Sequence, residues 1–225
     1  ADAAAIFGRH FAHTGYDDIP TAAVDAVKKS ILDTLGVALA ATTLGAGGRE
    51  LAELAKEGGG KEEGTIWGFG GRVPAWMAAW VNGGLAHSLD FDDVHYEGPT
   101  HPSGAIIPAA FAVAEAAAPT SGKDFITAIA LGHDMLMRMT SSMLGEVDLL
   151  GKWLSFPLFA VFAVSATSAK LLNLDHTKTQ MAIGASLAYA TGAGEIMRGN
   201  LRGLYDSWAA MGGVLAALMA KKGIS

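Results

Sequence analysis

The chain has 225 residues, of which 51% are hydrophobic and 17% charged, with a formal net charge of −6 and no cysteine. This composition allows a sizeable buried core, excludes disulfides, thiolate metal sites and a cysteine nucleophile, and gives no general attraction for nucleic acid. The absence of cysteine is compatible with a reducing cytoplasm, and that is the compartment we expect.

Neither a secretory signal nor a membrane span is expected. The first residues, 1–8, lack a basic start and a long apolar core. The longest uncharged runs, 153–169 and 179–194, fall short of the roughly 18 to 20 residues that a membrane helix needs. Both runs are rich in small residues, so we interpret them as buried helices.

Helical spacing of the apolar residues predicts helices along most of the chain. In chain order they cover about 2–13, 20–38, 48–56, 74–89, 103–118, 121–144, 157–172, 177–190 and 206–222. Only 65–69 resembles a β-strand, and it is short. We therefore predict an all-α fold, a compact multi-helix domain that includes residues 1–225 as one unit.

Several residues mark the expected helix ends. Ser121, followed three residues later by Asp124, is typical of an N-cap, and Asp206 is a candidate start of the last helix. Gly223 fits a C-cap. Gly36 lies inside a predicted helix, where glycine costs about 1 kcal/mol relative to alanine, and this predicts a closely packed neighbour.

Titratable residues are concentrated in 87–104, which holds three aspartates, one glutamate and three histidines in eighteen positions. Asp90, Asp92 and Asp93 should repel one another, which raises some of their pKa values and suits general acid–base chemistry. If the preceding helix continues through Asp93, then Asp90 and Asp93 share a face. The alternative is a solvated acidic helix end, although acids are disfavoured there.

His101 precedes Pro102 just before a helix and is an acid–base candidate at neutral pH. Alternatively, it caps backbone groups in a loop. Of the other two histidines in this stretch, His87 is a candidate for a hydrogen bond in the core and His95 for simple exposure.

A metal site is a competing interpretation, because the carboxylates with His95 and His101 could bind a divalent ion. The pair His133-Asp134 on a predicted helix would also fit a metal-dependent His-Asp phosphohydrolase, or else a core histidine. An anionic substrate would instead need a cation, and Arg198 and Arg202 lie just before the last helix, whose N-terminus adds partial positive charge.

Two motifs resemble the MmgE/PrpD family: the run from His87 to Asp93 (HSLDFDD) and the run from Thr100 to Gly104 (THPSG). The family includes 2-methylcitrate dehydratase, cis-aconitate decarboxylase and iminodisuccinate epimerase. The resemblance implies a dimeric helical domain followed by an α+β lid, which 1–225 would lack, so that the lid would come after residue 225 or from another chain. It also implies a small di- or tricarboxylate substrate and no metal or organic cofactor.

By this resemblance Asp90 and His101 fall on catalytic positions, and Arg202 falls where a lysine is frequent. The expected substrate-binding residues are Arg202, Lys152, Thr100 and Tyr205. There are three departures from the family pattern. Val94 stands where the family often has a threonine. Leu154 stands where several members have an active-site histidine. The spacing from Asp90 to His101 is one residue longer than in the decarboxylase.

We therefore expect a cofactor-free enzyme that abstracts a proton α to a carboxylate, with Asp90 and His101 as the proton-transfer pair in unassigned order. A 2-methylcitrate dehydratase-like hydro-lyase is the first expectation, and a decarboxylase or an epimerase is the alternative. The departures leave a second possibility, a non-catalytic helical assembly subunit. The metal-dependent phosphohydrolase is the third.

Overall fold

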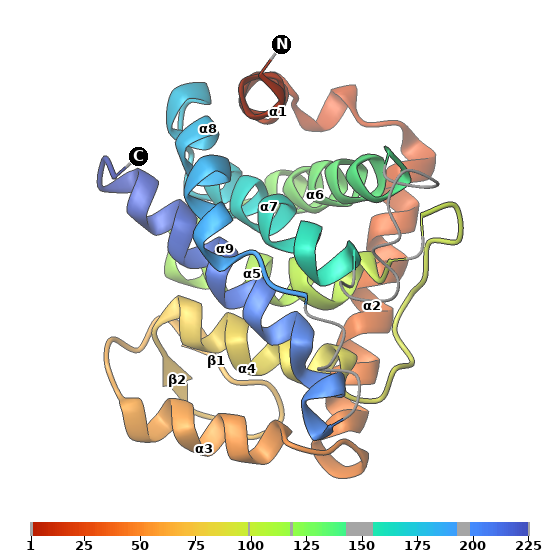
Figure 1. Ribbon diagram of the computed structural model, residues 1–225, viewed down its shortest axis with the longest axis vertical. Coiled ribbons are helices and arrows are strands. Elements are labelled where there is room, and N and C mark those ends of the chain that lie inside the picture. Colours follow the sequence, from red (N-terminus) through yellow and green to blue (C-terminus); the bar gives the residue numbers. More distant parts are fainter. Residues whose placement is uncertain (1, 99, 118, 143–154, 193–198, 225) are drawn as a thin grey trace.

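The computed structural model describes residues 2–98, 100–117, 119–142, 155–192 and 199–224. These residues form an all-α fold, as predicted, in which one short hairpin is the only sheet (Figure 1). The α-helices of this described part are α1 (Ala3–His13), α2 (Thr21–Leu44), α3 (Gly48–Gly58), α4 (Ala75–His87), α5 (Pro102–Ala116), α6 (Gly122–Ser142), α7 (Ser155–Leu171), α8 (His176–Ala185) and α9 (Tyr205–Lys221). Short 3-10 turns lie at η1 (Tyr16–Asp18), η2 (Ser186–Tyr189) and η4 (Asn200–Leu204).

Local sequence explains most helix ends. Ser121 Oγ accepts a hydrogen bond from Asp124 N at 3.1 Å and donates one to Asp124 Oδ2 at 2.6 Å, which confirms the predicted cap of α6. Gly223 has φ +88° just after α9 and ends that helix as expected. Helix α9 begins at Tyr205 without a side-chain cap, one residue before the predicted start, and Asp206 is buried in its first turn.

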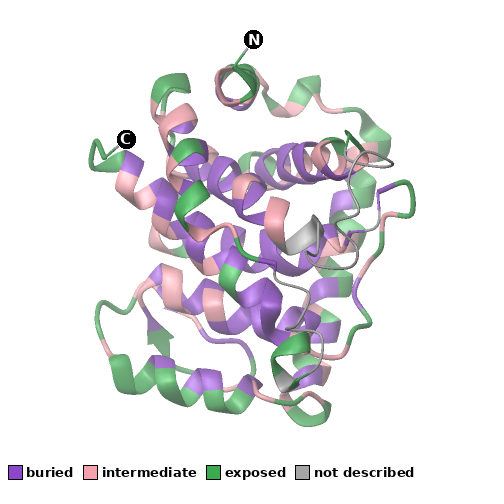
Figure 2. Cartoon of the chain, in the orientation of Figure 1, coloured by how far each residue is buried: buried purple, intermediate pink, exposed green. Residues whose placement is uncertain are grey.

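The centre of the domain is formed by α4, α5, α7 and α9, and most of their residues are buried (Figure 2). Glycines permit the close crossings. A Cβ on Gly83 of α4 would lie 3.1 Å from the Ala210 side chain of α9 and 3.2 Å from the Asp206 carbonyl oxygen. Helices α2, α3, α1 and α8 lie around this centre and carry much of the exposed surface (Figures 1 and 2).

The predicted strand at 65–69 is shorter than expected. Strand β1 (Gly64–Thr65) pairs antiparallel with β2 (Arg72–Val73), and the sequence pattern did not reveal β2. Between them Gly68, Gly70 and Gly71 all adopt positive φ, so the chain turns back where a longer strand was expected.

The prediction that a neighbour packs closely against Gly36 is wrong for the described residues, because no heavy atom lies within 4 Å of a Cβ built there. Among the helices described, none alone is long and apolar enough to cross a membrane, although α2 and α3 pass that test as a pair bent by 94°.

Candidate active site

Helix α4 ends at His87, so the acidic stretch is not helical. Asp90 adopts a left-handed conformation with φ +53°, which aspartate tolerates better than most residues, and its N–H donates to the His87 carbonyl at 2.8 Å. Asp90 and Asp93 therefore do not share a helical face, contrary to the conditional prediction. Instead, the three aspartates point to three different partners.

Asp92 lies between two histidines. Its side chain is fully buried, and His87 Nδ1 lies 2.9 Å from Oδ1 and 3.0 Å from Oδ2. His101 Nδ1 approaches Oδ1 at 3.5 Å. Burial alone raises the pKa of Asp92, but the hydrogen bonds from His101 and His87 outweigh it and lower the pKa below its ordinary value. Crowding of the three carboxylates was expected to raise some of their pKa values, and Asp92 is not one of those whose pKa rises.

The imidazole rings of His87 and His101 lie next to each other in this cluster. Their ring centroids are 4.9 Å apart, edge to face. For both rings burial is the largest effect and lowers the pKa. The interactions with Asp92 and the charge of Asp206 together outweigh it, so the pKa of His87 is raised and that of His101 reaches about 9. His87 is buried, whereas 19% of the His101 side chain is exposed. His101 is therefore a partly exposed acid that is cationic at neutral pH.

Asp90 pairs with Arg202 of η4. Arg202 Nη2 lies 2.5 Å from Asp90 Oδ2, and about half of each side chain is exposed. Asp90 Oδ1 is also 3.7 Å from His87 Nε2. The pair places an accessible guanidinium and an accessible carboxylate next to the buried histidine cluster.

Asp93 has a structural role. It accepts hydrogen bonds from Ser103 N at 3.2 Å, Ser103 Oγ at 2.6 Å and Ser30 Oγ at 3.1 Å. These bonds tie the loop to the first turn of α5 and to α2, and a carboxylate is favourable at a helix N-terminus. Asp93 thus shapes the loop that carries the other two aspartates.

Asp206 is a member of this cluster that the sequence did not reveal. It is fully buried, and within the described part of the chain neither carboxyl oxygen has a hydrogen-bond partner. Burial raises its pKa to about 7. An acid in the first turn of a helix is ordinary in sequence, because it suits the helix dipole, so no local signal distinguished Asp206.

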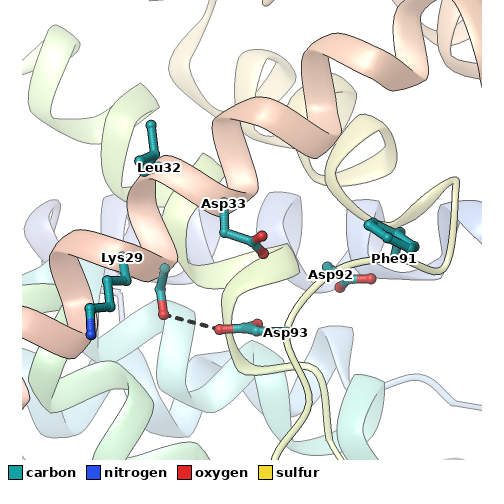
Figure 3. A pocket seen from close by; sticks show the side chains of 7 residues that line it. Lys29, Leu32, Asp33, Phe91, Asp92 and Asp93 are labelled. Atoms are coloured by element: carbon teal, nitrogen blue, oxygen red, sulfur yellow. Dashed lines mark hydrogen bonds between the residues drawn. The ribbon is translucent and has the colours of Figure 1, made fainter.

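A cavity of about 520 Å³ is lined by the acidic loop and by α2. Figure 3 shows Asp33 pointing across it toward Asp92 and Asp93, while the amino end of Lys29 points away. Burial and the charges of Asp93 and Asp92 raise the pKa of Asp33. Three carboxyl groups would repel an anion, so this cavity does not fit a carboxylate substrate.

A profile of the MmgE/PrpD N-terminal domain matches residues 6–225. The chain belongs to the MmgE/PrpD family. It is 30% identical over 205 residues to human cis-aconitate decarboxylase, covering 88% of this chain and 41% of that protein. It is 33% identical over 170 residues to the cis-aconitate decarboxylase-like protein oryM of Aspergillus oryzae (71% and 34% covered), and 26% identical over 213 residues to cis-aconitate decarboxylase of Aspergillus terreus (92% and 43%). The chain spans 34–43% of the length of these relatives.

The structure of this MmgE/PrpD domain brings three of the six predicted site residues close to His87. These are Asp90, His101 and Tyr205, whose ring centroid is 4.4 Å from that of His87. Arg202 joins them through Asp90. Burial raises the pKa of Tyr205, so its hydroxyl stays protonated. Substrate binding by Tyr205 and Arg202 remains a prediction.

The other predicted positions differ in how far they can be placed. Thr100 is buried, and its carbonyl accepts from His95 N at 2.9 Å, so its visible contribution is to fold the loop. Val94, where the family pattern has threonine, is 45% exposed. Lys152, Leu154 and Arg198 lie outside the described residues, and their predicted roles are untested.

Metal binding was the competing interpretation of these histidines and carboxylates. Of the described residues, His87, Asp92 and His101 offer donor atoms within 4.8 Å of one another. Both His87 Nδ1 and His101 Nδ1 face Asp92, however, which is the geometry of a hydrogen-bonded cluster. We therefore interpret the three residues as an acid–base group.

The pair His133-Asp134 does not form a joint site. His133 is buried, and its Nε2 lies 3.3 Å from Ser103 Oγ. Since that hydroxyl donates to Asp93, His133 is the donor to Ser103. Asp134 points elsewhere and binds Arg138 Nε with both oxygens at 2.8 Å. This geometry argues against the His-Asp phosphohydrolase.

Gly104 of α5 is where Asp92 and Asp206 converge. A Cβ there would collide with Asp206 Oδ2 and lie 3.0 Å from Asp92 Oδ2. We expect Gly104→Ala to lower the free energy of unfolding by about 1–3 kcal/mol, since a methyl group must be forced into a packed site. Gly36→Ala is the control, because the space around it is open and alanine should stabilise the helix by about 0.5–1 kcal/mol. Urea unfolding of both variants measures this, and equal effects would contradict the packing argument.

Proposed function

We propose that the protein is a cofactor-free lyase for a small tricarboxylate, and that decarboxylation of cis-aconitate is the first reaction to test. The observation that carries the proposal is the partly exposed acid His101, next to the accessible pair Asp90 and Arg202. The names of the relatives, which are cis-aconitate decarboxylases or a protein like them, are the reason to test decarboxylation before the dehydration that the sequence motifs first suggested.

Decarboxylation needs an acid and an anion-binding group. When a carboxylate leaves as CO2, the electron pair of the broken carbon–carbon bond stays on the substrate, and one proton must be added to carbon. His101 supplies this proton, because its raised pKa keeps it protonated at neutral pH. Arg202 exchanges its bond to Asp90 for a substrate carboxylate, which guanidinium binds in a bidentate geometry.

Dehydration of 2-methylcitrate uses the same groups in a different way. A base removes the proton α to a carboxylate, and an acid protonates the departing hydroxyl so that water leaves. Asp90 would be the base and His101 the acid, since Asp90 is the accessible carboxylate nearest the cluster. An epimerase would need only the removal and the return of a proton.

The direct test incubates the purified protein with cis-aconitate and follows CO2 release, and in parallel with 2-methylcitrate to detect the unsaturated product. Release of CO2 supports the decarboxylase, and water loss alone supports the dehydratase. Absence of turnover with both compounds, in a folded protein with the full family length, would contradict the proposal.

Arg202 gives a second prediction for the same assay. Arg202→Ala should raise KM at least about tenfold, because the charge-assisted bonds to a substrate carboxylate are lost. Arg9→Ala is the control, since Arg9 is exposed on α1, a helix that contributes no residue to the site. An unchanged KM in Arg202→Ala would remove Arg202 from the substrate site.

A non-catalytic assembly subunit is the second candidate function. The exposed apolar side chains on and beside α2 favour it, since Leu32, Leu39 and Phe91 are 74%, 54% and 79% exposed. We propose that this surface contacts another copy of the helical domain or a lid-bearing partner. Sedimentation of the parent and of Leu32→Glu distinguishes the two functions. If Leu32→Glu changes the association state of a protein that turns over neither cis-aconitate nor 2-methylcitrate, the assembly function is supported. A strictly monomeric parent protein argues against it.

A further inference from the structure

The histidine pair carries more positive charge than Asp92 alone can balance. Both imidazole pKa values are raised although the rings lie 4.9 Å apart and each charge disfavours the other. Asp92 interacts with both rings, but it supplies a single negative charge. Asp90 Oδ1 also lies 3.7 Å from His87 Nε2, but its side chain is 43% exposed and is paired with Arg202. A buried site that holds two imidazolium ions therefore needs a second buried counter-charge.

Asp206 is in the right place to supply this charge. Gly104 is the contact point of both Asp206 Oδ2 and Asp92 Oδ2, so the two carboxyl groups lie close together. Asp206 is completely buried, and within the described structure its oxygens accept no hydrogen bond. A buried carboxyl group without such partners is costly, and in this chain the charges of His87 and His101 favour its ionised form.

The groups that act on Asp206 come from two elements besides its own helix. They are His87 at the end of α4, and Asp92, Asp93 and His101 in the loop that leads into α5. Within α9, the charge of Asp206 contributes to the raised pKa of the neighbouring Tyr205. Burial raises the pKa of Asp206 to about 7, the charge of His87 opposes this, and that of Asp92 adds to it. Asp206 therefore changes its charge near neutral pH, where His101 is still protonated.

We propose that Asp206 is a positioning residue whose ionised carboxylate is the second counter-charge of the His87–His101 pair and keeps His101 in its acid form. The role of His101 as the acid rests on the proposed function, but the charge coupling itself does not. At pH values above about 7 the carboxylates of Asp206 and Asp92 are then both ionised beside His101, whose pKa is about 9. Below that pH Asp206 takes up a proton and remains a neutral acid.

The test measures protonation directly, without substrate. The seven histidines of the protein are labelled with 15N in the ring, and their titrations are followed by NMR in the parent and in Asp206→Asn. Asparagine has nearly the same shape but no charge, so the pKa of His101 should fall by about 1 unit or more. Asp25→Asn is the control, because it removes one exposed carboxylate on α2 and should leave the His101 titration unchanged.

Infrared spectroscopy gives an independent measurement. The parent should show the C=O stretch of a protonated carboxylic acid that disappears as the pH rises through about 7. Asp206→Asn should lack that band. If Asp206→Asn does not fold, Asp206→Ser removes the charge with a smaller side chain. The inference is overturned if His101 titrates alike in the parent and in the folded Asp206 variant, or if the band persists in the variant.

These measurements separate this inference from the proposed function. A shifted His101 titration in a protein without turnover supports the role of Asp206 and contradicts the lyase. Turnover in a protein whose His101 titration is unchanged by Asp206→Asn supports the lyase and contradicts the role of Asp206. If both hold, the pH at which turnover declines should move to lower pH in Asp206→Asn, which a purely structural role of Asp206 would not produce.

Discussion

Replacement of His101 by alanine is expected to lower kcat for the proposed substrate by about 100- to 10,000-fold, the usual contribution of a positioned acid. His101 is the one imidazole of the described cluster that combines a raised pKa with an exposed edge. Its loss removes the proton donor while Asp90 and Arg202 remain. The measurement is steady-state turnover of cis-aconitate, with 2-methylcitrate as the second substrate.

The pH profile of the parent protein provides a further check on His101. An acid with a pKa of about 9 is protonated below that value, so turnover should be retained at neutral pH and fall as the pH passes about 9. His10→Ala is a matched control, because His10 lies at the far end of the domain on α1. If His101→Ala kept the parent kcat and the parent pH profile, His101 would not be the proton donor.

Asp92→Ala is expected to lower the free energy of unfolding by about 3–5 kcal/mol at pH 6, because it leaves two imidazoles without their buried counter-charge. The penalty should shrink as the pH rises. The folded pKa of His101 is raised, so its stabilising contribution is fully present below about 6.5 and is lost as the pH rises through about 9. Urea unfolding at pH 6 and pH 10 measures both effects.

The contribution of Asp92 itself to stability depends on pH in the opposite direction. Its folded pKa is lowered, so its contribution is present above about 3.8 and is lost as the pH falls through the folded pKa. Asp134→Ala serves as the control, since the Asp134–Arg138 pair is exposed and should contribute no more than about 1 kcal/mol. A penalty for Asp92→Ala that is identical at pH 6 and pH 10 would show that shape rather than charge makes Asp92 important.

The helical fold could be predicted from sequence because its signals are local. Apolar spacing predicted every α-helix of the described part. Ser121 marked the start of α6 and Gly223 the end of α9, as predicted. Predictions failed where distant segments decide the outcome. The strand at 65–69 was cut short by a glycine turn, and the neighbour expected at Gly36 is absent from the described structure.

The candidate site was predicted only in part. The sequence identified the stretch 87–104 and the residues Asp90 and His101, because titratable groups stand out in an apolar chain and match a family motif. It could not assign separate roles to Asp90, Asp92 and Asp93, which are nearly adjacent in sequence. Their partners Arg202, His87 and Ser103 lie 112, 5 and 10 residues away, respectively. Which aspartate meets which partner is therefore known only from the folded chain.

The sequence by itself therefore determined the helical class, the family resemblance and the stretch that carries the chemistry. The tertiary structure decided which groups are charged and which face solvent. Two facts needed it above all: Asp92 is a fully buried counter-charge, and Asp206 joins the cluster from the start of α9. The physical reason is that protonation depends on burial and on neighbouring charges, and both arise only when α4, the acidic loop and α9 come together.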